Sequence, residues 1–209
     1  MPTLQPLFEP TTLKLDAPNA RVVLTYPLTE ADDADQLRCL TTEAFTKYLP
    51  MMNPNMTLEQ VAARRESQNA AGAFKVFKMN HVSTGEFIGS GGFYRIEKDN
   101  FAYDCGLSIL PEFHRSGFAS EALFLVLDHG FHLGFNRVTF VTNAENQGMR
   151  GWLENACGAK LEGVFRQSWR DDKIDGWVDS VMYSILRSEW DGGMRERLLT
   201  KVNKYLVQV

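Results

Sequence analysis

Residues 104–123, DCGLSILPEFHRSGFASEAL, constrain the fold more than any other part of the chain. An apolar run with a strand pattern ends at Pro111, a basic turn with a glycine follows, and a helical pattern begins near Gly117. Such a joint directs free backbone N–H groups and the positive end of a helix at one point, which suits a pyrophosphate. Gly117 allows close approach and Ala119 is small enough not to block it. The same pattern is also typical of an ordinary helix start, so both interpretations stay open at this point.

Other phosphate and hydrolase motifs are missing from the chain. There is no G-x-x-x-x-G-K-[ST] sequence, and GSGGFY at residues 89–94 fails G-x-G-x-x-G at its last position. No G-x-S-x-G nucleophile elbow occurs either. Mononucleotide and dinucleotide sites of the usual kinds are therefore disfavoured.

The hydrophobic patterns predict a mixed α/β (α+β) domain. A chain of 209 residues is expected to form one large domain. Four of the eight prolines fall in residues 1–20, which predicts an extended arm, followed by a domain over 21–190 and a closing amphipathic helix within 191–209. Strands are expected at 22–25, 74–79, 86–89, 101–110, 137–142, 160–169 and 177–186, and helices start after 29, at 57, at 117, at 149 and at 188.

Charge and cysteine usage exclude several classes of protein. The 22 basic and 26 acidic residues give a formal charge of −4, which argues against a general nucleic-acid binder. Cys39, Cys105 and Cys157 are far apart without C-x-x-C spacing, so neither a disulfide scaffold nor a zinc site is indicated. No apolar stretch approaches the roughly 18 residues of a membrane helix, and no secretory leader pattern is present. We expect a cytoplasmic protein without a membrane span.

An ordered set of motifs resembles the GNAT superfamily of N-acetyltransferases, in particular its RimJ/RimL-type branch. HRSGFA at residues 114–119 is similar to the family signature [Q/R]-x-x-G-x-[G/A], with His114 in place of the usual first residue. The segment 158–166, GAKLEGVFR, and the residues between Asp175 and Trp190 match further family motifs. The resemblance covers about residues 21–190 and implies a mixed central sheet that splays at the acetyl-CoA site, flanked by helices.

The resemblance also implies which residues contact acetyl-CoA as cosubstrate. In the family the loop cradles the pyrophosphate through backbone N–H groups, the preceding strand pairs with the pantetheine arm, and an Asn contacts the cofactor. These positions correspond here to Leu107, Ile109, Leu110, His114, Arg115, Ser116, Gly117, Phe118, Ala119, Ser120, Asn146 and Met149. Two departures stand out. Met149 replaces the usual Ser, and the count from Asn146 to Gly158 is one residue longer than the family norm.

Acetyl transfer to an amine needs a proton acceptor, because a free alkylamine has a pKa near 10 and is mostly charged at neutral pH. Asp104 resembles the acidic residue of the family's E-x-G-Y strand and is the first candidate for the base, with Glu86 and Glu112 as weaker choices. An exposed carboxylate without a role is an equally open interpretation of Asp104. The chain has no tyrosine where many relatives place the acid, so Ser108 or solvent is considered for that role.

Three other features favour packing or solvation over function. His129 and His132 share a helix face, but without a third ligand nearby in the sequence they do not predict a metal site. Met51, Met52 and Pro54 lie in a connector where the family builds part of its acceptor pocket, although a packed surface loop is favoured. Four acids could attract a cationic acceptor, although a solvated hairpin is the more common role; they are Asp171, Asp172, Asp175 and Asp179.

The sequence therefore predicts an enzyme that transfers an acetyl group from acetyl-CoA to a primary amine by direct attack. A protein N-terminus or a small-molecule amine would serve as the acceptor, and a homodimer is compatible with the chain. The alternative is a catalytically silent acyl-CoA-binding or regulatory module. A phosphate-binding enzyme unrelated to acetylation is a weaker third hypothesis.

Overall fold

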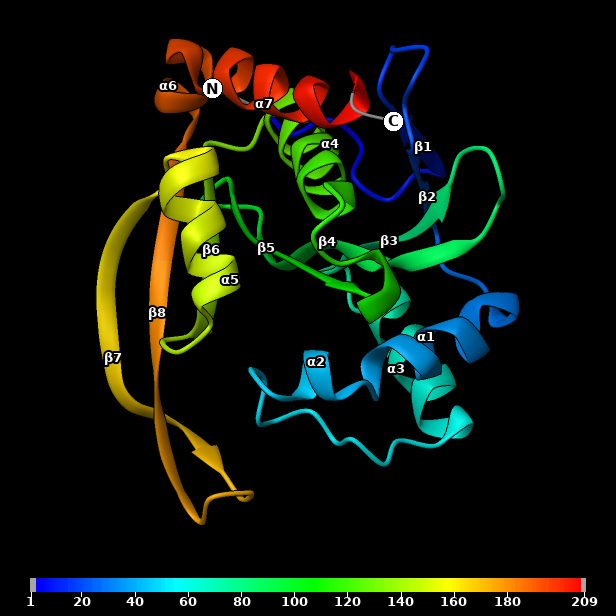
Figure 1. Cartoon of the computed structure of the whole chain (residues 1–209), viewed down its shortest axis with the longest axis vertical. Helices are drawn as coiled ribbons and strands as arrows, with labels where there is room; N and C mark the ends of the chain where they lie inside the picture. Colours follow the sequence, from blue (N-terminus) through cyan, green and yellow to red (C-terminus); the bar gives the residue numbers. More distant parts are fainter. Residues whose placement is uncertain (1–2, 208–209) are drawn as a thin grey trace.

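The computed structural model describes residues 3–207, and its centre is one eight-stranded sheet (Figure 1). The strand order is β1-β2-β3-β4-β5-β6-β8-β7. The strands are β1 (Thr11–Lys14), β2 (Val22–Tyr26), β3 (Lys75–His81), β4 (Phe87–Glu97), β5 (Ala102–Ile109), β6 (Arg137–Asn143), β7 (Lys160–Asp171) and β8 (Gly176–Leu186). Every expected strand is present, and β1 is additional.

The sheet is mixed and splays at its only parallel pair among the described residues. Neighbouring strands are antiparallel except β5 and β6. These two strands pair only where Ala102, Tyr103 and Asp104 face Arg137, Val138 and Thr139. Beyond that point β5 continues to Ile109 and β6 to Asn143 without pairing with each other. The mixed, splayed sheet flanked by helices is therefore confirmed.

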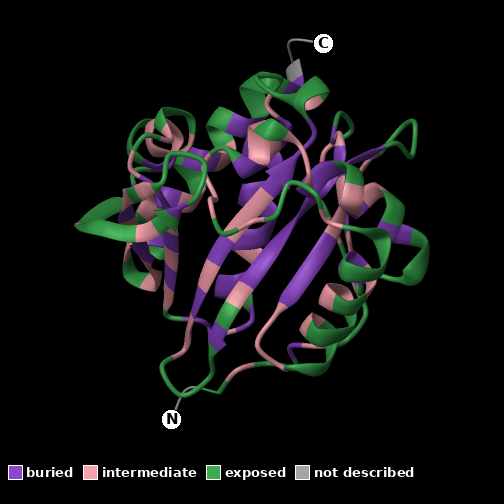
Figure 2. Ribbon diagram, turned by 90° about the horizontal axis from the view of Figure 1, so that it is seen from below, coloured by how far each residue is buried: buried purple, intermediate pink, exposed green. Residues whose placement is uncertain are grey.

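Helices cover both faces of the sheet. The helices are α1 (Asp33–Leu40), α2 (Glu43–Thr46), α3 (Leu58–Ala70), α4 (Phe118–His132), α5 (Gln147–Gly151), α6 (Arg187–Glu189) and α7 (Arg195–Val207). On one face α4 packs against β2, β4 and β5 with α7 behind it, and on the other α1 and α3 pack against β3, β4 and β5. Figure 2 shows that buried residues are concentrated along the central strands between these layers.

The ends of the chain are more closely integrated than the sequence suggested. The expected arm contains β1, which pairs antiparallel with β2 at the edge of the sheet, and Leu7 and Leu15 are buried in the core. The closing segment was expected to be one helix from residue 188. Instead, the non-helical conformations of Gly192 and Gly193 separate α6 from α7. Two glycines next to each other have little resistance to such a kink.

The extra residue between Asn146 and Gly158 is accommodated by a change of helix type. The expected short helix begins as α5 and then widens into a π-helical turn over Trp152–Cys157, which ends at Gly158 in the left-handed region with φ of 83°. A π-turn closes hydrogen bonds one residue further along than an α-turn, so it takes up one inserted residue without changing what lies on either side. Leu153 and Cys157 remain buried in the core.

Candidate functional site

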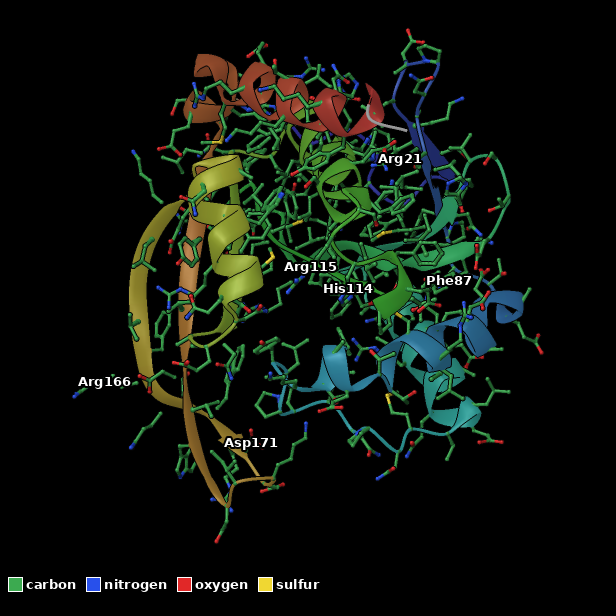
Figure 3. All side chains as sticks on the ribbon, in the orientation of Figure 1. Arg21, Phe87, His114, Arg115, Arg166 and Asp171 are labelled. Carbon is green, nitrogen blue, oxygen red and sulfur yellow. The ribbon has the colours of Figure 1, made fainter. Side chains whose placement is uncertain are left out.

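The loop between β5 and α4 presents a row of unbonded N–H groups. Gly117, the N-cap of α4, has φ of 87°, and Arg115 also lies in the left-handed region with φ of 59°. Within residues 3–207, no acceptor bonds the backbone N–H groups of residues 115–120. The first turn of a 15-residue helix therefore adds its positive end to a cradle that fits a diphosphate. The side chains of His114 and Arg115 extend from this loop (Figure 3).

Arg21, at the start of the domain, and Glu121 of α4 support the back of this loop. Arg21 donates from Nη1 to the carbonyl oxygen of Ser116 at 2.9 Å, and its guanidinium lies 4.6 Å from the centre of the Phe118 ring. Glu121 is fully buried and accepts the N–H groups of Arg21 and Val22 at 2.9 and 3.0 Å. The Arg21 and Glu121 side chains are 3.6 Å apart at their closest charged atoms. The sequence did not reveal Arg21, because its partners are about 100 residues away.

The free edge of β5 faces the gap that the splay leaves. The N–H of Leu110 bonds the carbonyl of Ile88 at 2.9 Å. Because backbone groups alternate in direction along a strand, those of Leu107 and Ile109 point away from β4 and into the gap. Nε2 of His114 lies 2.9 Å from the carbonyl oxygen of Ile109, which can accept only from a protonated Nε2. The structure thus brings Leu107, Ile109 and His114 together at the free edge of β5.

Leu110 does not reach that gap. Its side chain is buried against Cys39 and Phe87, and its carbonyl accepts the N–H of Phe113 at 3.0 Å. Both backbone groups of Leu110 are bonded inside the protein. Leu110 therefore stabilises the end of the strand and offers no free backbone group to a ligand in the gap.

The residues on the far side of the gap are held by local bonds. Asn146 caps α5 by accepting the Met149 N–H at 3.1 Å, and its amide nitrogen donates to Thr142 at 3.0 Å. Both ends of this amide are therefore engaged before any ligand arrives. Met149 packs on the main core, and Nε1 of Trp152 donates to the Ser120 hydroxyl at 3.0 Å, which ties the π-turn to the start of α4.

Asp104 lies where the splay begins, on the face of β5 away from α4, and its carboxylate is already bonded. Thr139 of β6 donates to Oδ1, and Nε of Arg95 donates to Oδ2 at 2.5 Å, with Nη2 of Arg95 on the same oxygen. The Asp104 side chain is 20% exposed, and that of Arg95 is 65% exposed. Asp104 is therefore partly exposed, and an arginine covers it.

The two candidates for a proton donor differ in access. Ser108 is buried, and its hydroxyl contacts the Ser90 hydroxyl and carbonyl, each at 3.4 Å, beneath Gln36 of α1. Tyr94 was not considered in the sequence. Its ring covers Gly106 of β5, since a Cβ built on that glycine would lie 3.5 Å from Tyr94 Cε2. Burial raises the pKa of Tyr94 to about 12, so its hydroxyl keeps its proton at neutral pH.

The weaker candidates lie apart from this gap. Glu86 and Glu112 are exposed, and Glu112 lies 3.9 Å from Arg38. His129 is enclosed by Phe77 and Phe93, and burial lowers its pKa to about 4. Residues 3–207 contain no group of three or more His, Cys, Asp or Glu side chains arranged to hold a metal ion.

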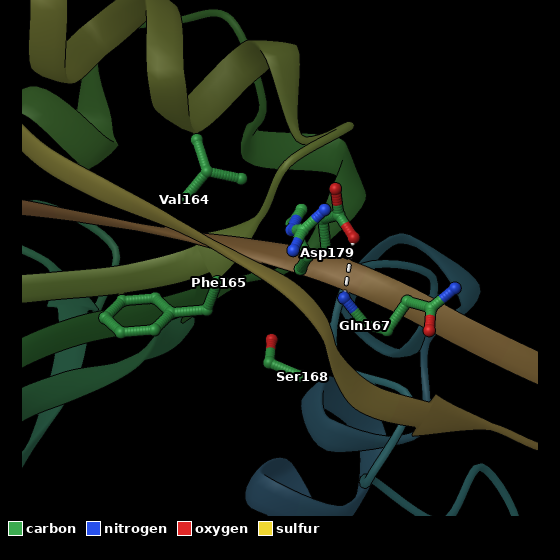
Figure 4. Close-up of a pocket in the computed structure, with 6 residues that line it drawn as sticks. Val164, Phe165, Gln167, Ser168 and Asp179 are labelled. Carbon is green, nitrogen blue, oxygen red and sulfur yellow. Dashed lines mark hydrogen bonds between the residues drawn. The ribbon is translucent and has the colours of Figure 1, made fainter.

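The acids of the β7–β8 hairpin are mostly used locally. Arg170 contacts Asp172 and Asp175 at 3.1 and 2.5 Å, while Asp171 and Asp179 accept backbone N–H groups. A groove of about 790 Å³ lies beside the bulge of β7, lined by Val164, Phe165, Arg166, Gln167, Ser168 and Asp179 (Figure 4). Arg166 and Asp171 lie on this hairpin, apart from the loop of α4 (Figure 3). Each of the four acids is therefore hydrogen-bonded within the hairpin.

Comparison with known proteins identifies the chain. Residues 21–159 match the model of the acetyltransferase (GNAT) domain family, which covers the splayed strands, the loop and α4. The chain belongs to the GNAT acetyltransferases. Among its relatives, an uncharacterized N-acetyltransferase of Bacillus subtilis, YoaA, is 27% identical over 164 residues, which are 77% of this chain and 90% of that protein. The family assignment makes the chain an acetyl-CoA-dependent acetyltransferase that acts on an amine.

Solved structures of other GNAT proteins show the same fold. An N-acetyltransferase from Brucella melitensis has a TM-score of 0.77 at 22% identity and covers 96% of this chain and 89% of its own. RimJ of Mycobacterium smegmatis, solved with CoA-disulfide, has a TM-score of 0.75 at 20% identity and covers 92% and 93%. No helix within residues 3–207 of this GNAT protein is long and apolar enough to cross a membrane.

Proposed function

We propose that this GNAT protein transfers an acetyl group to a primary amine by direct attack, as a member of the RimJ/RimL-type branch. One observation supports this most. A single strand, β5, carries Asp104 where the splay begins and leads into the N–H cradle of residues 115–120 at the other end of the gap. The acyl donor and the acceptor would meet along that strand. Both a small-molecule amine and a protein N-terminus remain candidate acceptors.

The residues around the gap would hold acetyl-CoA in a defined way. The N–H groups of residues 115–120, which include those of Ser116, Phe118, Ala119 and Ser120, bind the pyrophosphate, and Arg115 adds a cation. The free backbone groups of Leu107 and the N–H of Ile109 pair with the pantetheine amides, while His114 already bonds the Ile109 carbonyl. Asn146 and Met149 form the opposite wall through α5. Acetyl-CoA supplies the activated acetyl group.

Asp104 serves as the proton acceptor in this proposal. The acceptor arrives mostly as an ammonium ion, and attack requires its neutral form. A carboxylate at the start of the splay can bind the ammonium and receive its proton directly or through one water. Solvent returns a proton to the departing thiolate, because the Ser108 hydroxyl is buried and directed toward Ser90. The Tyr94 hydroxyl, with a pKa of about 12, gives up its proton less readily than a thiol does. A thiol pKa near 8.5 makes this last step helpful without making it essential.

The test combines an amine panel with acetyl-CoA binding. Purified protein is incubated with acetyl-CoA and with amino acids, polyamines, aminoglycosides and peptides with free N-termini, and free thiol is measured. Asp104→Asn is expected to lower the rate with the best acceptor by about 10²- to 10⁴-fold while the acetyl-CoA Kd stays unchanged. Glu66→Gln, which changes a carboxylate that is 72% exposed on α3, is the matched control.

The outcomes separate the proposal from its alternative. Thiol release with one amine class identifies the acceptor. Acetyl-CoA binding without release for any amine would instead show a silent acyl-CoA-binding module. An Asp104→Asn enzyme with normal turnover would remove Asp104 from the mechanism and leave the family assignment intact.

We also propose that two copies associate through β7. This edge strand is exposed and carries Leu161, Val164 and Phe165 with 46 to 53% of their surface accessible. Antiparallel pairing of β7 with itself about Val164 would bring these apolar side chains of the two copies together. It would also place Arg166 opposite Glu162, whose carboxylate Arg137 of the same chain already bonds at 2.8 Å. Sedimentation should show a dimer, and Val164→Lys should shift it to the monomer.

A further inference from the structure

Arg95 has an unusual position beside Asp104. The pairing of β4 with β5 shifts between Tyr94 and Glu97, and Arg95 lies in this bulge with φ of 45°. A non-glycine residue in the left-handed region is uncommon, and such residues occur often at ligand sites. The bulge turns the Arg95 side chain onto the face of the sheet that carries Asp104.

Only some of the hydrogen-bond donors of the Arg95 guanidinium have a partner among the described residues. Nε and Nη2 both bond Oδ2 of Asp104, and Nη1 has no hydrogen-bond partner among the side chains and backbone groups of residues 3–207. A guanidinium has five N–H donors in a planar fork. Because 65% of its side chain is exposed, Arg95 can bind a second anionic group that approaches from solvent.

We infer that Arg95 and Asp104 together recognise the two ends of a free α-amino acid; this inference rests on the proposed function of Asp104. An amino acid carries its ammonium and carboxylate on one carbon, so it presents opposite charges side by side, as the Arg95–Asp104 pair does. The ammonium binds Asp104 and the carboxylate binds Arg95, which replaces one ion pair with two. Arg95 thereby becomes a residue that determines acceptor specificity.

This exchange of ion-pair partners also explains how Asp104 becomes free to bind an amine. While Arg95 bonds Oδ2, an incoming amine must compete with a guanidinium for the carboxylate. A substrate with its own carboxylate draws Arg95 away, whereas a polyamine or a peptide N-terminus has no anion on the adjacent carbon. Asp104 then takes one proton from the ammonium, and the amine nitrogen forms the C–N bond as the C–S bond breaks. The thiolate takes up a proton, so the products are an N-acetyl amino acid, CoA thiol and one released proton.

The test compares each amino acid with its amide, which lacks the negative charge, at a pH of about 6, where the α-ammonium groups of both are protonated. Binding to protein saturated with CoA is measured by calorimetry, and thiol release is measured with acetyl-CoA, for wild type, Arg95→Gln and Arg95→Lys. Arg197→Gln, an exposed arginine on α7, is the control. At least one amino acid should bind wild type about tenfold or more tightly than its amide, as expected for a charge-assisted bidentate contact. Arg95→Gln should abolish that preference, and Arg95→Lys should keep part of it.

The two readouts fail in different ways. Equal binding of acids and amides to wild type, or an unchanged preference in Arg95→Gln, overturns the inference whatever the activity. Rapid thiol release with amines, without a preference for amino acids over their amides, supports the proposed function and contradicts the amino-acid site. A binding preference that depends on Arg95 without thiol release for any amine supports the amino-acid site and contradicts the proposed transfer.

Discussion

Replacing Gly117 with alanine should damage the loop of α4 in two separable ways. The backbone of Gly117 has φ of 87°, where an L-residue costs roughly 1–2 kcal/mol. A Cβ there would lie 2.8 Å from Cγ and 2.9 Å from Cβ of Tyr205, and 2.9 Å from Nη2 of Arg21. The Arg21 end can move, but Tyr205 Cβ is fixed to α7, so the loop itself must shift.

The expected loss has two parts. The conformational cost and the contact with Tyr205 together should lower the free energy of unfolding by about 2–3 kcal/mol. For a chain of this length that corresponds to a fall in Tm of about 4–12 °C. If the shift of the loop breaks one N–H bond to phosphate, worth about 1.5–3 kcal/mol, the acetyl-CoA Kd should rise at least about tenfold.

Gly158→Ala provides the matched control. Gly158 has φ of 83°, nearly that of Gly117, but nothing lies within 4 Å of a Cβ built there. This variant should show only the conformational cost in urea unfolding and should bind acetyl-CoA like wild type by calorimetry. If Gly117→Ala is no less stable than Gly158→Ala and binds acetyl-CoA equally well, the loop does not depend on this close packing and the reasoning is refuted.

Three further substitutions test the contacts around the loop and the buried side chain of Lys75. Arg21→Lys, which loses the bond to Ser116, should raise the acetyl-CoA Kd about tenfold in calorimetry without lowering kcat at saturation. Trp152→Phe, which loses the bond to Ser120, should lower the free energy of unfolding in urea by about 1 kcal/mol, and an unchanged value would contradict its role as a tie. Burial lowers the pKa of Lys75 from 10.5 to about 8, so the unfolded chain binds more protons between these values and stability should rise with pH there. Lys75→Met should remove that rise in unfolding experiments between pH 7 and 10.5 and should stabilise the protein at pH 7.

The conformation of the loop that we propose to bind acetyl-CoA could be predicted because its determinants are local in sequence. Strand, turn, left-handed glycine and helix start all lie within residues 104–123, and each has a signature that a single sequence shows. The start of α3, expected at residue 57, is local in the same way, since Thr57 and Gln60 form a capping box with bonds of 3.0 and 3.3 Å. The extra residue before Gly158 was visible, but its accommodation in a π-turn was not.

What the sequence could not show depends on contacts between distant residues. Arg21 reaches Ser116 across 95 positions, and nothing in either segment alone indicates the other. Arg95 looks like an ordinary exposed residue until the bulge of β4 turns it onto Asp104. The burial of Ser108 was not visible in the sequence either, because it is produced by α1, which packs across β4 and β5.

The difference between the features that the sequence predicts and those that it does not has a physical cause, which also separates the donor site from the acceptor site. A pyrophosphate is bound by backbone N–H groups, and these depend on chain conformation and hardly on side-chain identity, so a short motif can encode the donor site. An amine acceptor is distinguished from others by charges placed on different strands, here Arg95 on β4 and Asp104 on β5. The register between those strands decides whether the charges meet, and register is set by the whole sheet. A relative that keeps the loop but lacks the β4 bulge should therefore keep acetyl-CoA binding and lose the preference for amino acids.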